Sequence, residues 1–149
     1  MTKKLAVLGA TGSIGQQTLR VVEEFPDDFK VVALAAGSNV ELLAKQARQF
    51  NPEYVAIGNP QFYPKLAELL ADTKIKLRVG TAGLAELAVL PEVDIVVSAV
   101  VGAIGIEPTV AAVRAGKQIA LANKEVLVAA GGLIMPALEA HRAKLIPVD

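Results

Sequence analysis

Three glycines, each three residues from the next, stand in the stretch VLGATGSIG near the amino terminus: Gly9, Gly12 and Gly15. In a dinucleotide-binding loop, the first glycine permits a sharp turn off a strand and the second lets the backbone approach the pyrophosphate. The third allows a helix to pack closely on the strand. Amides of the first helical turn, with the hydroxyls of Thr11 and Ser13, would face the anion. The spacing predicts a dinucleotide-binding loop; the alternative is a glycine-rich turn that binds nothing.

The end of the second apolar run indicates which dinucleotide is preferred. This segment is AAGSN, from Ala35 to Asn39, and no acidic residue lies between Val31 and Val40. NAD sites usually carry Asp or Glu there, which accepts hydrogen bonds from the ribose hydroxyls. Neutral Ser38 and Asn39 can instead donate to a 2′-phosphate, so the sequence favours NADP. The alternative is that these residues only cap the following helix.

Two more groups of polar residues follow apolar runs. Asn123 and Glu125 suit the start of a helix, as N-cap and as first-turn acid. Lys124 does not, because a cation at a helix N-terminus is unfavourable unless a bound anion offsets it; the alternative is an exposed lysine that points away. Asp149, after the last run, can bind a metal, accept a proton or begin a loop. Ligands of doubly wound sheets collect at the carboxyl ends of strands, so both groups are candidate site residues.

A parallel sheet is needed to bring these residues together, and the hydrophobic pattern predicts one. Strands are expected over Leu5–Leu8, Val31–Ala35, Tyr54–Ile57, Leu77–Val79, Asp94–Ser98, Gln118–Ala122 and Leu145–Val148. Helices are expected over Ser13–Phe25, Val40–Phe50, Gln61–Ala71, Leu84–Leu90, Pro108–Ala115 and Val126–Ala143, the last whole or broken near Gly131. The alternation predicts an α/β fold: a doubly wound, mostly parallel Rossmann-like sheet of six or seven strands with helices on both faces.

Composition narrows the function classes. The chain is 53% hydrophobic and only 4% aromatic, which suits aliphatic strands buried on both faces. Fifteen basic and fifteen acidic residues leave no positive excess for a nucleic acid. The longest weakly polar stretch, residues 95–106, is too short to span a bilayer. We expect one cytoplasmic domain without nucleic-acid or membrane partners. Because the chain ends directly after its last predicted strand, we also expect it to be part of a longer polypeptide.

Five segments, in order along all 149 residues, resemble the 1-deoxy-D-xylulose 5-phosphate reductoisomerase family: VLGATGSIGQQTL, AAGSN, SAVVGAIGIEPTVAA, ALANKEVLVAAG and LIPVD. GATGSIG is shared with many oxidoreductases, whereas ALANKE joined to the closing PVD is much more specific. The resemblance covers only the amino-terminal NADPH-binding domain of that family. It implies an enzyme that uses NADPH and Mg²⁺ or Mn²⁺ to isomerise and reduce 1-deoxy-D-xylulose 5-phosphate to 2-C-methyl-D-erythritol 4-phosphate in non-mevalonate isoprenoid biosynthesis. It also implies a homodimer for the full-length protein.

The resemblance implies a role for each matching residue. NADPH would be bound by residues of three loops: Gly9, Thr11, Gly12, Ser13, Ile14, Gly37, Ser38, Asn39, Asn123 and Glu125. Lys124 would contact the substrate, as a catalytic residue that supplies positive charge and a donor. Asp149 would be a ligand of Mg²⁺ or Mn²⁺, which would polarise the substrate oxygens.

The chain departs from the family pattern at two points. Many members carry a basic residue at the position of Ser38, which leaves the strength of 2′-phosphate recognition open. The next metal-binding carboxylate of the family follows shortly after the position of Asp149, where this chain ends. We therefore expect the chain to fold and bind NADPH but not to turn over alone. The alternatives are a redox-sensing NADP-binding module without catalysis, or another NADP-dependent dehydrogenase, such as a semialdehyde dehydrogenase whose catalytic cysteine this chain lacks.

Overall fold

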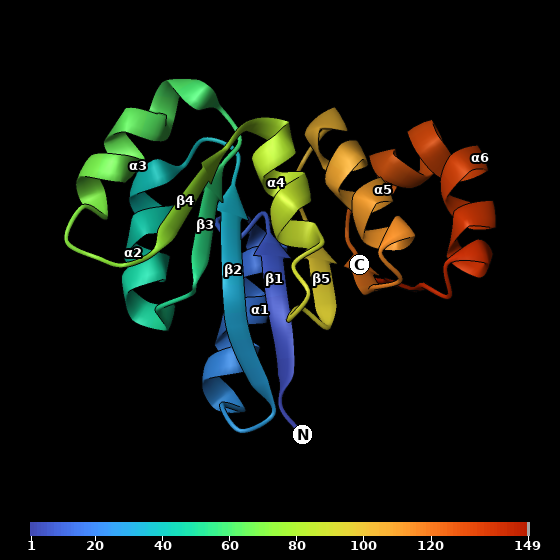
Figure 1. Cartoon of the computed structure of the whole chain (residues 1–149), viewed down its shortest axis with the longest axis horizontal. Helices are drawn as coiled ribbons and strands as arrows, with labels where there is room; N and C mark the ends of the chain where they lie inside the picture. Colours follow the sequence, from blue (N-terminus) through green and yellow to red (C-terminus); the bar gives the residue numbers. More distant parts are fainter. Residues whose placement is uncertain (149) are drawn as a thin grey trace.

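One parallel sheet organises the molecule (Figure 1). The computed structural model describes residues 1–148, and the side chains of all of them except those at 124, 127, 129, 130 and 133. Within this part the sheet has seven strands: β1 (Lys3–Leu8), β2 (Phe29–Ala36), β3 (Tyr54–Ile57), β4 (Lys76–Val79), β5 (Ile95–Ser98), β6 (Gln118–Leu121) and β7 (Lys144–Pro147). The helices are α1 (Ser13–Glu24), α2 (Val40–Phe50), α3 (Tyr63–Leu69), α4 (Gly80–Ala88), α5 (Ile106–Arg114) and α6 (Lys124–Ala140), with 3₁₀ turns at Pro60–Phe62 and Ala103–Gly105.

The strand order places the topological switch point of the sheet beside β1. The order is β4-β3-β2-β1-β5-β6-β7, and every neighbouring pair is parallel. The chain first builds outward from β1 through β2, then returns to the other side of β1 to form β5. At its carboxyl end, Leu8 of β1 pairs with Ala35 of β2 and with Ser98 of β5. Connections leave β1 and β5 in opposite directions there, which is the switch point where doubly wound sheets bind ligands.

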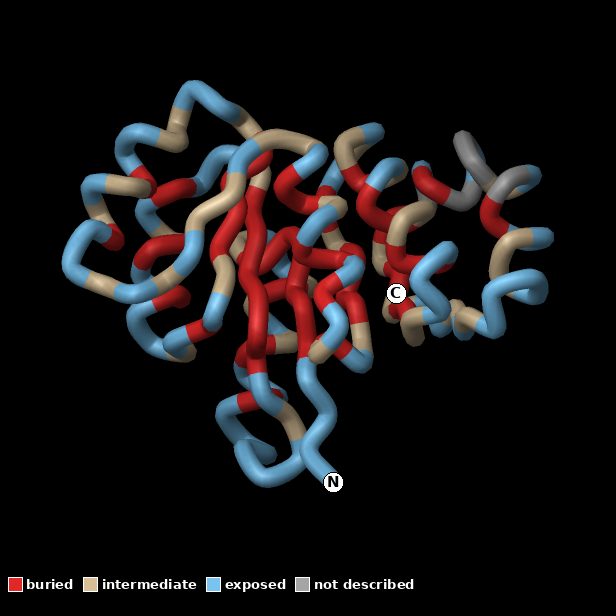
Figure 2. The backbone as a smooth tube through the Cα atoms, viewed as in Figure 1, coloured by how far each residue is buried: buried red, intermediate tan, exposed pale blue. Residues whose placement is uncertain are grey.

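Two aliphatic cores hold the helices to the sheet. One contains Leu34, Leu43 and Leu66, and joins the sheet to α1–α3. The other contains Leu84 and Ile134, and joins the opposite face to α4–α6. Figure 2 shows the buried residues concentrated along the central strands. Among residues 1–148, no helix has the length and apolar character that crossing a membrane requires.

The predicted fold class is confirmed, and the differences lie at element ends. The predicted helix over Gln61–Ala71 divides into the turn Pro60–Phe62 and α3. α4 begins at Gly80, directly after β4, and therefore earlier than predicted. α6 is continuous through Gly131, so the break considered there is absent. Glycine costs a helix only about 1 kcal/mol, and α6 packs against α5.

Candidate dinucleotide site

Gly9 turns the chain sharply at the end of β1. Its φ is +92°, and a Cβ there would lie 2.5 Å from the backbone carbon of Ala99, in the loop after β5. The amides of Gly9 and Ala10 both donate to the Ala35 carbonyl, each at 2.8 Å. The turn is therefore fixed on both sides, by the end of β2 and by the β5 loop. This geometry matches the conformational role predicted for the first glycine.

The other two glycines of the motif differ from each other. A Cβ at Gly15 would overlap the Gly9 carbonyl oxygen, so close packing of α1 on the end of β1 requires glycine. A Cβ at Gly12 would meet only that oxygen, at 3.6 Å, and the φ of −81° suits any residue. Gly12 is exposed. The fold itself does not need glycine at this position, and the absence of a side chain leaves space at the start of α1.

The N-terminus of α1 has unpaired amides. Gly12 is its N-cap and provides no side-chain hydrogen bond. The amides of Thr11, Ser13 and Ile14 donate no hydrogen bond to any described residue. A helix N-terminus in this state attracts an anion, because its orphan N–H groups and the helix dipole both favour negative charge.

The carbonyl groups of the same loop are all bonded within the protein. The Gly12 amide donates to the Gly9 oxygen at 3.2 Å. Gln16 Nε2 donates to the Thr11 oxygen at 2.9 Å, and Gln46 Nε2 donates to the Ala10 oxygen at 2.8 Å. Sequence reasoning missed Gln46. A signal was available, because Gln46 stands three residues after Leu43, on the face of α2 that carries its apolar residues.

The loop after β2 lies beside the glycine loop, because β1 and β2 are neighbours. None of the described atoms lies within 4 Å of a Cβ built at Gly37, so this glycine also leaves open space. Ser38 and Asn39 are exposed. Asn39 Oδ1 accepts from the Leu42 amide at 3.3 Å, so the helix-capping alternative is observed for Asn39. The capping bond uses the oxygen of Asn39 and leaves its NH₂ group for another acceptor.

Asn123 joins the β5 loop to the start of α6. It is 7% exposed, and its Nδ2 donates to the carbonyls of Val100 and Gly102 at 2.5 and 3.0 Å. Its Oδ1 accepts from the Glu125 amide at 2.9 Å, which confirms the predicted N-cap. Both amide hydrogens are therefore used inside the chain. Asn123 therefore ties the start of α6 to the β5 loop, whose Ala99 backbone lies close to Gly9.

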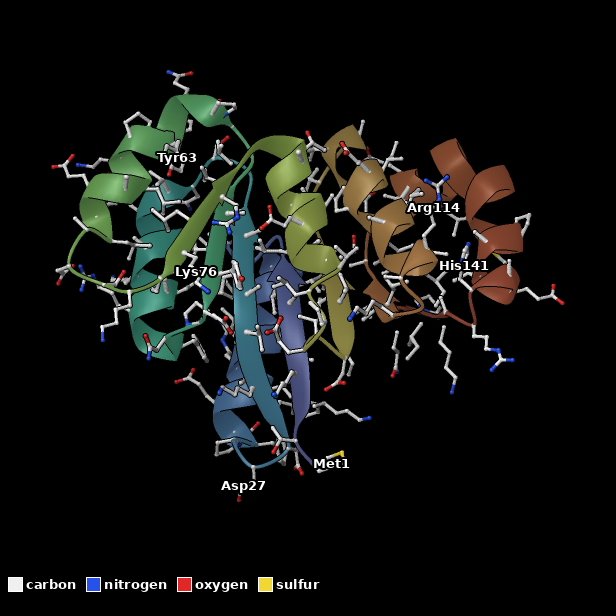
Figure 3. All side chains as sticks on the ribbon, viewed as in Figure 1. Met1, Asp27, Tyr63, Lys76, Arg114 and His141 are labelled. Atoms are coloured by element: carbon white, nitrogen blue, oxygen red, sulfur yellow. The ribbon has the colours of Figure 1, made fainter. Side chains whose placement is uncertain are left out.

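The remaining predicted site residues are less completely described. Lys124 is the first residue of α6, but its side chain lies outside the described part of the structure; Glu125 is exposed in the first helical turn. Asp149 lies outside the described residues. Across residues 1–148 there is no group of three His, Asp or Glu side chains placed to hold a metal ion. His141 lies exposed at the end of α6, before β7 and so toward the opposite edge of the sheet (Figure 3).

The opposite, amino-terminal edge of the sheet carries Lys117, whose ammonium group bonds to two backbone carbonyls. Lys117 Nζ donates to the carbonyls of Leu90 and Val93, each at 2.7 Å, and so ties the loop after α4 to the start of β6. Burial lowers the pKa of Lys117, against the opposing effect of nearby Asp94 and Glu92. A hollow of about 320 Å³ near this edge is lined by Lys4, Lys30, Lys74 and others, and none of the predicted site residues lines it.

The family model described as 1-deoxy-D-xylulose 5-phosphate reductoisomerase matches residues 5–131. This chain belongs to the 1-deoxy-D-xylulose 5-phosphate reductoisomerase family. The enzyme of that name from Trichlorobacter lovleyi is 50% identical over 147 residues, which are 99% of this chain and 38% of the relative. The chloroplastic enzyme of that name from Oryza sativa is 49% identical over 99% of this chain and 32% of its own length. The chain thus spans about a third of the length of these relatives.

Solved structures of this family share the fold closely. The reductoisomerase from Zymomonas mobilis in complex with NADPH is 42% identical, with a TM-score of 0.95 over 100% of this chain and 39% of its own. A DOX-P reductoisomerase in complex with magnesium is 40% identical, with a TM-score of 0.97 over 100% of this chain and 38% of its own. A putative homoserine dehydrogenase from Archaeoglobus fulgidus, 22% identical with a TM-score of 0.62, shares the fold alone.

Proposed function

We propose that this chain binds NADPH at the carboxyl edge of its sheet, as the cofactor-binding part of a 1-deoxy-D-xylulose 5-phosphate reductoisomerase. The observation that carries the proposal is the open start of α1. Gly12, which neither conformation nor packing requires, stands among the unpaired amides of Thr11, Ser13 and Ile14. A pyrophosphate supplies acceptors for those amides and fits where a side chain at Gly12 would otherwise stand. The Zymomonas mobilis relative, whose structure contains NADPH, supports the choice of ligand.

The adenosine ribose and its 2′-phosphate would lie against the neighbouring loop. Gly37 leaves space there, and Ser38 and the NH₂ group of Asn39 provide neutral donors. The absence of an Asp or Glu removes the group that would repel a 2′-phosphate. Glu125 and the β5 loop held by Asn123 would contact the nicotinamide half. When bound, NADPH would supply the hydride for the reduction.

For the whole protein we propose conversion of 1-deoxy-D-xylulose 5-phosphate to 2-C-methyl-D-erythritol 4-phosphate by a cytoplasmic homodimer that uses Mg²⁺ or Mn²⁺. Residues 1–149 would form its NADPH-binding domain. Lys124 begins α6 at the same edge as the glycine loop, and we propose that it contacts the substrate. Asp149 would be a metal ligand. A relative whose structure contains fosmidomycin and magnesium supports the metal requirement.

Titration of the chain with NADPH and with NADH, followed by the fluorescence of the reduced nicotinamide, tests the cofactor proposal. We expect NADPH to bind more tightly than NADH. Equal affinities would contradict the role given to Ser38 and Asn39. If the chain binds neither NADPH nor NADH, the proposal is overturned.

A hybrid protein tests the activity. Residues 1–149 would replace the matching residues of the Trichlorobacter lovleyi relative, with which they share 50% identity. We expect oxidation of NADPH that depends on both 1-deoxy-D-xylulose 5-phosphate and Mg²⁺. A folded hybrid that binds NADPH but gives no turnover would contradict the proposed activity while leaving the cofactor proposal intact. The unmodified relative is the control.

A further inference from the structure

Gln46 is a buried polar residue that reaches the glycine loop from a distant part of the chain. It lies on α2, is 6% exposed, and its Nε2 donates to the Ala10 carbonyl at 2.8 Å. The two residues are 36 positions apart in the sequence. Gln46 touches none of the unpaired amides itself, so any effect on a ligand must pass through the Ala10–Thr11 peptide.

Because the Ala10–Thr11 peptide is planar, the contact of Gln46 with the Ala10 carbonyl also fixes the direction of the Thr11 N–H. In a trans peptide the C=O and the following N–H point in opposite directions. Because the Ala10 oxygen points into the protein toward Gln46, the Thr11 amide points away from it, toward the open start of α1. The Thr11 amide donates no hydrogen bond to any residue that the structure describes. The protein therefore orients the Thr11 amide without giving it a hydrogen-bond acceptor among the described residues.

The packing of α2 gives no reason for a glutamine at this position. Leu43 and Ala47, on either side of Gln46 on the buried face of the helix, are fully buried. Gln46 Oε1 is also buried and has no hydrogen-bond partner. A buried oxygen without a partner destabilises a fold, and methionine would fill nearly the same volume without it. The polar side chain thus contributes something other than packing.

We infer that Gln46 is a positioning residue for the cofactor: it holds the Ala10–Thr11 peptide so that the Thr11 N–H, and not the Ala10 C=O, faces the pyrophosphate. The inference rests on the proposed NADPH site. Gln16 Nε2, which donates to the Thr11 carbonyl at 2.9 Å, fixes the next peptide, whose Gly12 N–H donates to the Gly9 oxygen. Without these contacts a peptide can rotate and present its carbonyl oxygen to the phosphate, which replaces an attraction with a repulsion.

Two substitutions of Gln46 test the inference. Gln46→Met removes the donor and keeps the volume, and we expect NADPH affinity to fall about 10-fold, as for the loss of one hydrogen bond to a charged group. Gln46→Glu replaces the donor with a carboxylate that repels the Ala10 carbonyl and attracts a rotated Thr11 amide, so we expect a larger loss. NADH affinity should fall by the same factor, because the pyrophosphate is common to both coenzymes.

Gln49→Met is the matched control. Gln49 lies one turn further along α2, and its Nε2 donates to the exposed Glu23 carboxylate at 2.6 Å, away from the loop. We expect this variant to bind both coenzymes like the wild type. The amide ¹H–¹⁵N resonance of Thr11 gives a readout that a general loss of stability would not produce. It should shift in the ligand-free Gln46→Glu variant and not in Gln49→Met.

The outcomes separate this inference from the function on which it rests. If the wild-type chain binds neither coenzyme, the proposed function fails and the inference fails with it. If the wild type binds NADPH and a folded Gln46→Met variant binds it equally well, the inference alone is overturned. A loss for NADPH without a matching loss for NADH would also overturn it, because it would place the effect at the 2′-phosphate.

Discussion

α1 and α6 begin at the same edge of the sheet and are built in opposite ways. At α6, the Asn123 side chain caps the helix and binds two carbonyls of the β5 loop. At α1, the N-cap is Gly12, which has no side chain, and the adjacent amides of Thr11 and Ser13 donate no hydrogen bond within the described part of the chain. The start of α6 is completed by its own chain, whereas the start of α1 is open to the ligand proposed above. The contrast shows that a helix N-terminus is informative only once its hydrogen bonds have been accounted for.

The same contrast divides the glycines of the GATGSIG motif. Gly9 and Gly15 are required by the fold, one by its positive φ and the other by the closeness of a neighbouring carbonyl. Gly12 is required by neither. The equal spacing of the three residues thus conceals two different reasons for having glycine.

The largest expected effect comes from Gly15, the packing glycine of α1. Gly15→Ala places a methyl group against the Gly9 carbonyl, and we expect the free energy of unfolding to fall by about 3 kcal/mol in urea denaturation. Gly132→Ala is the matched control on α6, because no atom that the structure describes lies within 4 Å of its Cβ position. It should be neutral or stabilise by up to about 1 kcal/mol. Equal stabilities for the two variants would remove the distinction between required and open glycines.

Gly12 should give nearly as large an effect, on binding instead of stability. Gly12→Val fills the space at the start of α1, so we expect NADPH affinity to fall about 100-fold, equivalent to about 2.7 kcal/mol. The unfolding free energy should stay within about 1 kcal/mol of the wild type, because the new Cβ would contact only the Gly9 oxygen among the described atoms, at 3.6 Å. Fluorescence titration and urea denaturation measure the two quantities. Unchanged binding would mean that the phosphates lie elsewhere.

Asn123 tests the capped half of the comparison. Asn123→Ala loses the cap and leaves two loop carbonyls without their donor, so we expect a loss of about 2 kcal/mol in unfolding free energy. Asn123→Asp separates the two functions, because aspartate caps a helix as well as asparagine but cannot donate to Val100 and Gly102. It should remain clearly less stable than the wild type. A fully stable Asn123→Asp variant would show that the cap is the whole contribution.

The smallest expected effect concerns the loop before α2, where Ser38 precedes the N-cap Asn39. The capping bond of Asn39 leaves its NH₂ group free. Ser38→Asp introduces a carboxylate beside the proposed 2′-phosphate position, and we expect the preference for NADPH over NADH to fall about 10-fold, or about 1.4 kcal/mol. Ser13→Asp is the control at the pyrophosphate, and it should weaken both coenzymes equally. An unchanged ratio in Ser38→Asp would place the 2′-phosphate away from this loop.

The sequence predicts the secondary structure and the sheet of this molecule better than its long-range side-chain hydrogen bonds. Alternating apolar runs and helical repeats are local properties, so the sheet, and the edge at which the candidate site is expected, follow from them. The cap formed by Asn123 is also local, and the sequence predicts it. Two other connections are not local. Gln46 bonds to Ala10, 36 positions away, and Asn123 bonds to Val100 and Gly102, 23 and 21 positions away. No local sequence pattern encodes these contacts. Residue spacing likewise cannot separate Gly12 from Gly15, because that distinction depends on which atoms lie nearby.

The two hydrogen bonds that the Ala35 carbonyl accepts have a consequence for how long the glycine loop persists. The amides of Gly9 and Ala10 lose these bonds only when the end of β1 separates from β2, an opening of the central sheet. Their hydrogen exchange should therefore be as slow as that of the core strands. The neighbouring amides of Thr11 and Ser13 should exchange quickly until a ligand protects them. Within five residues, the loop thus contains amides that exchange as slowly as those of the core strands and amides whose exchange depends on a bound ligand.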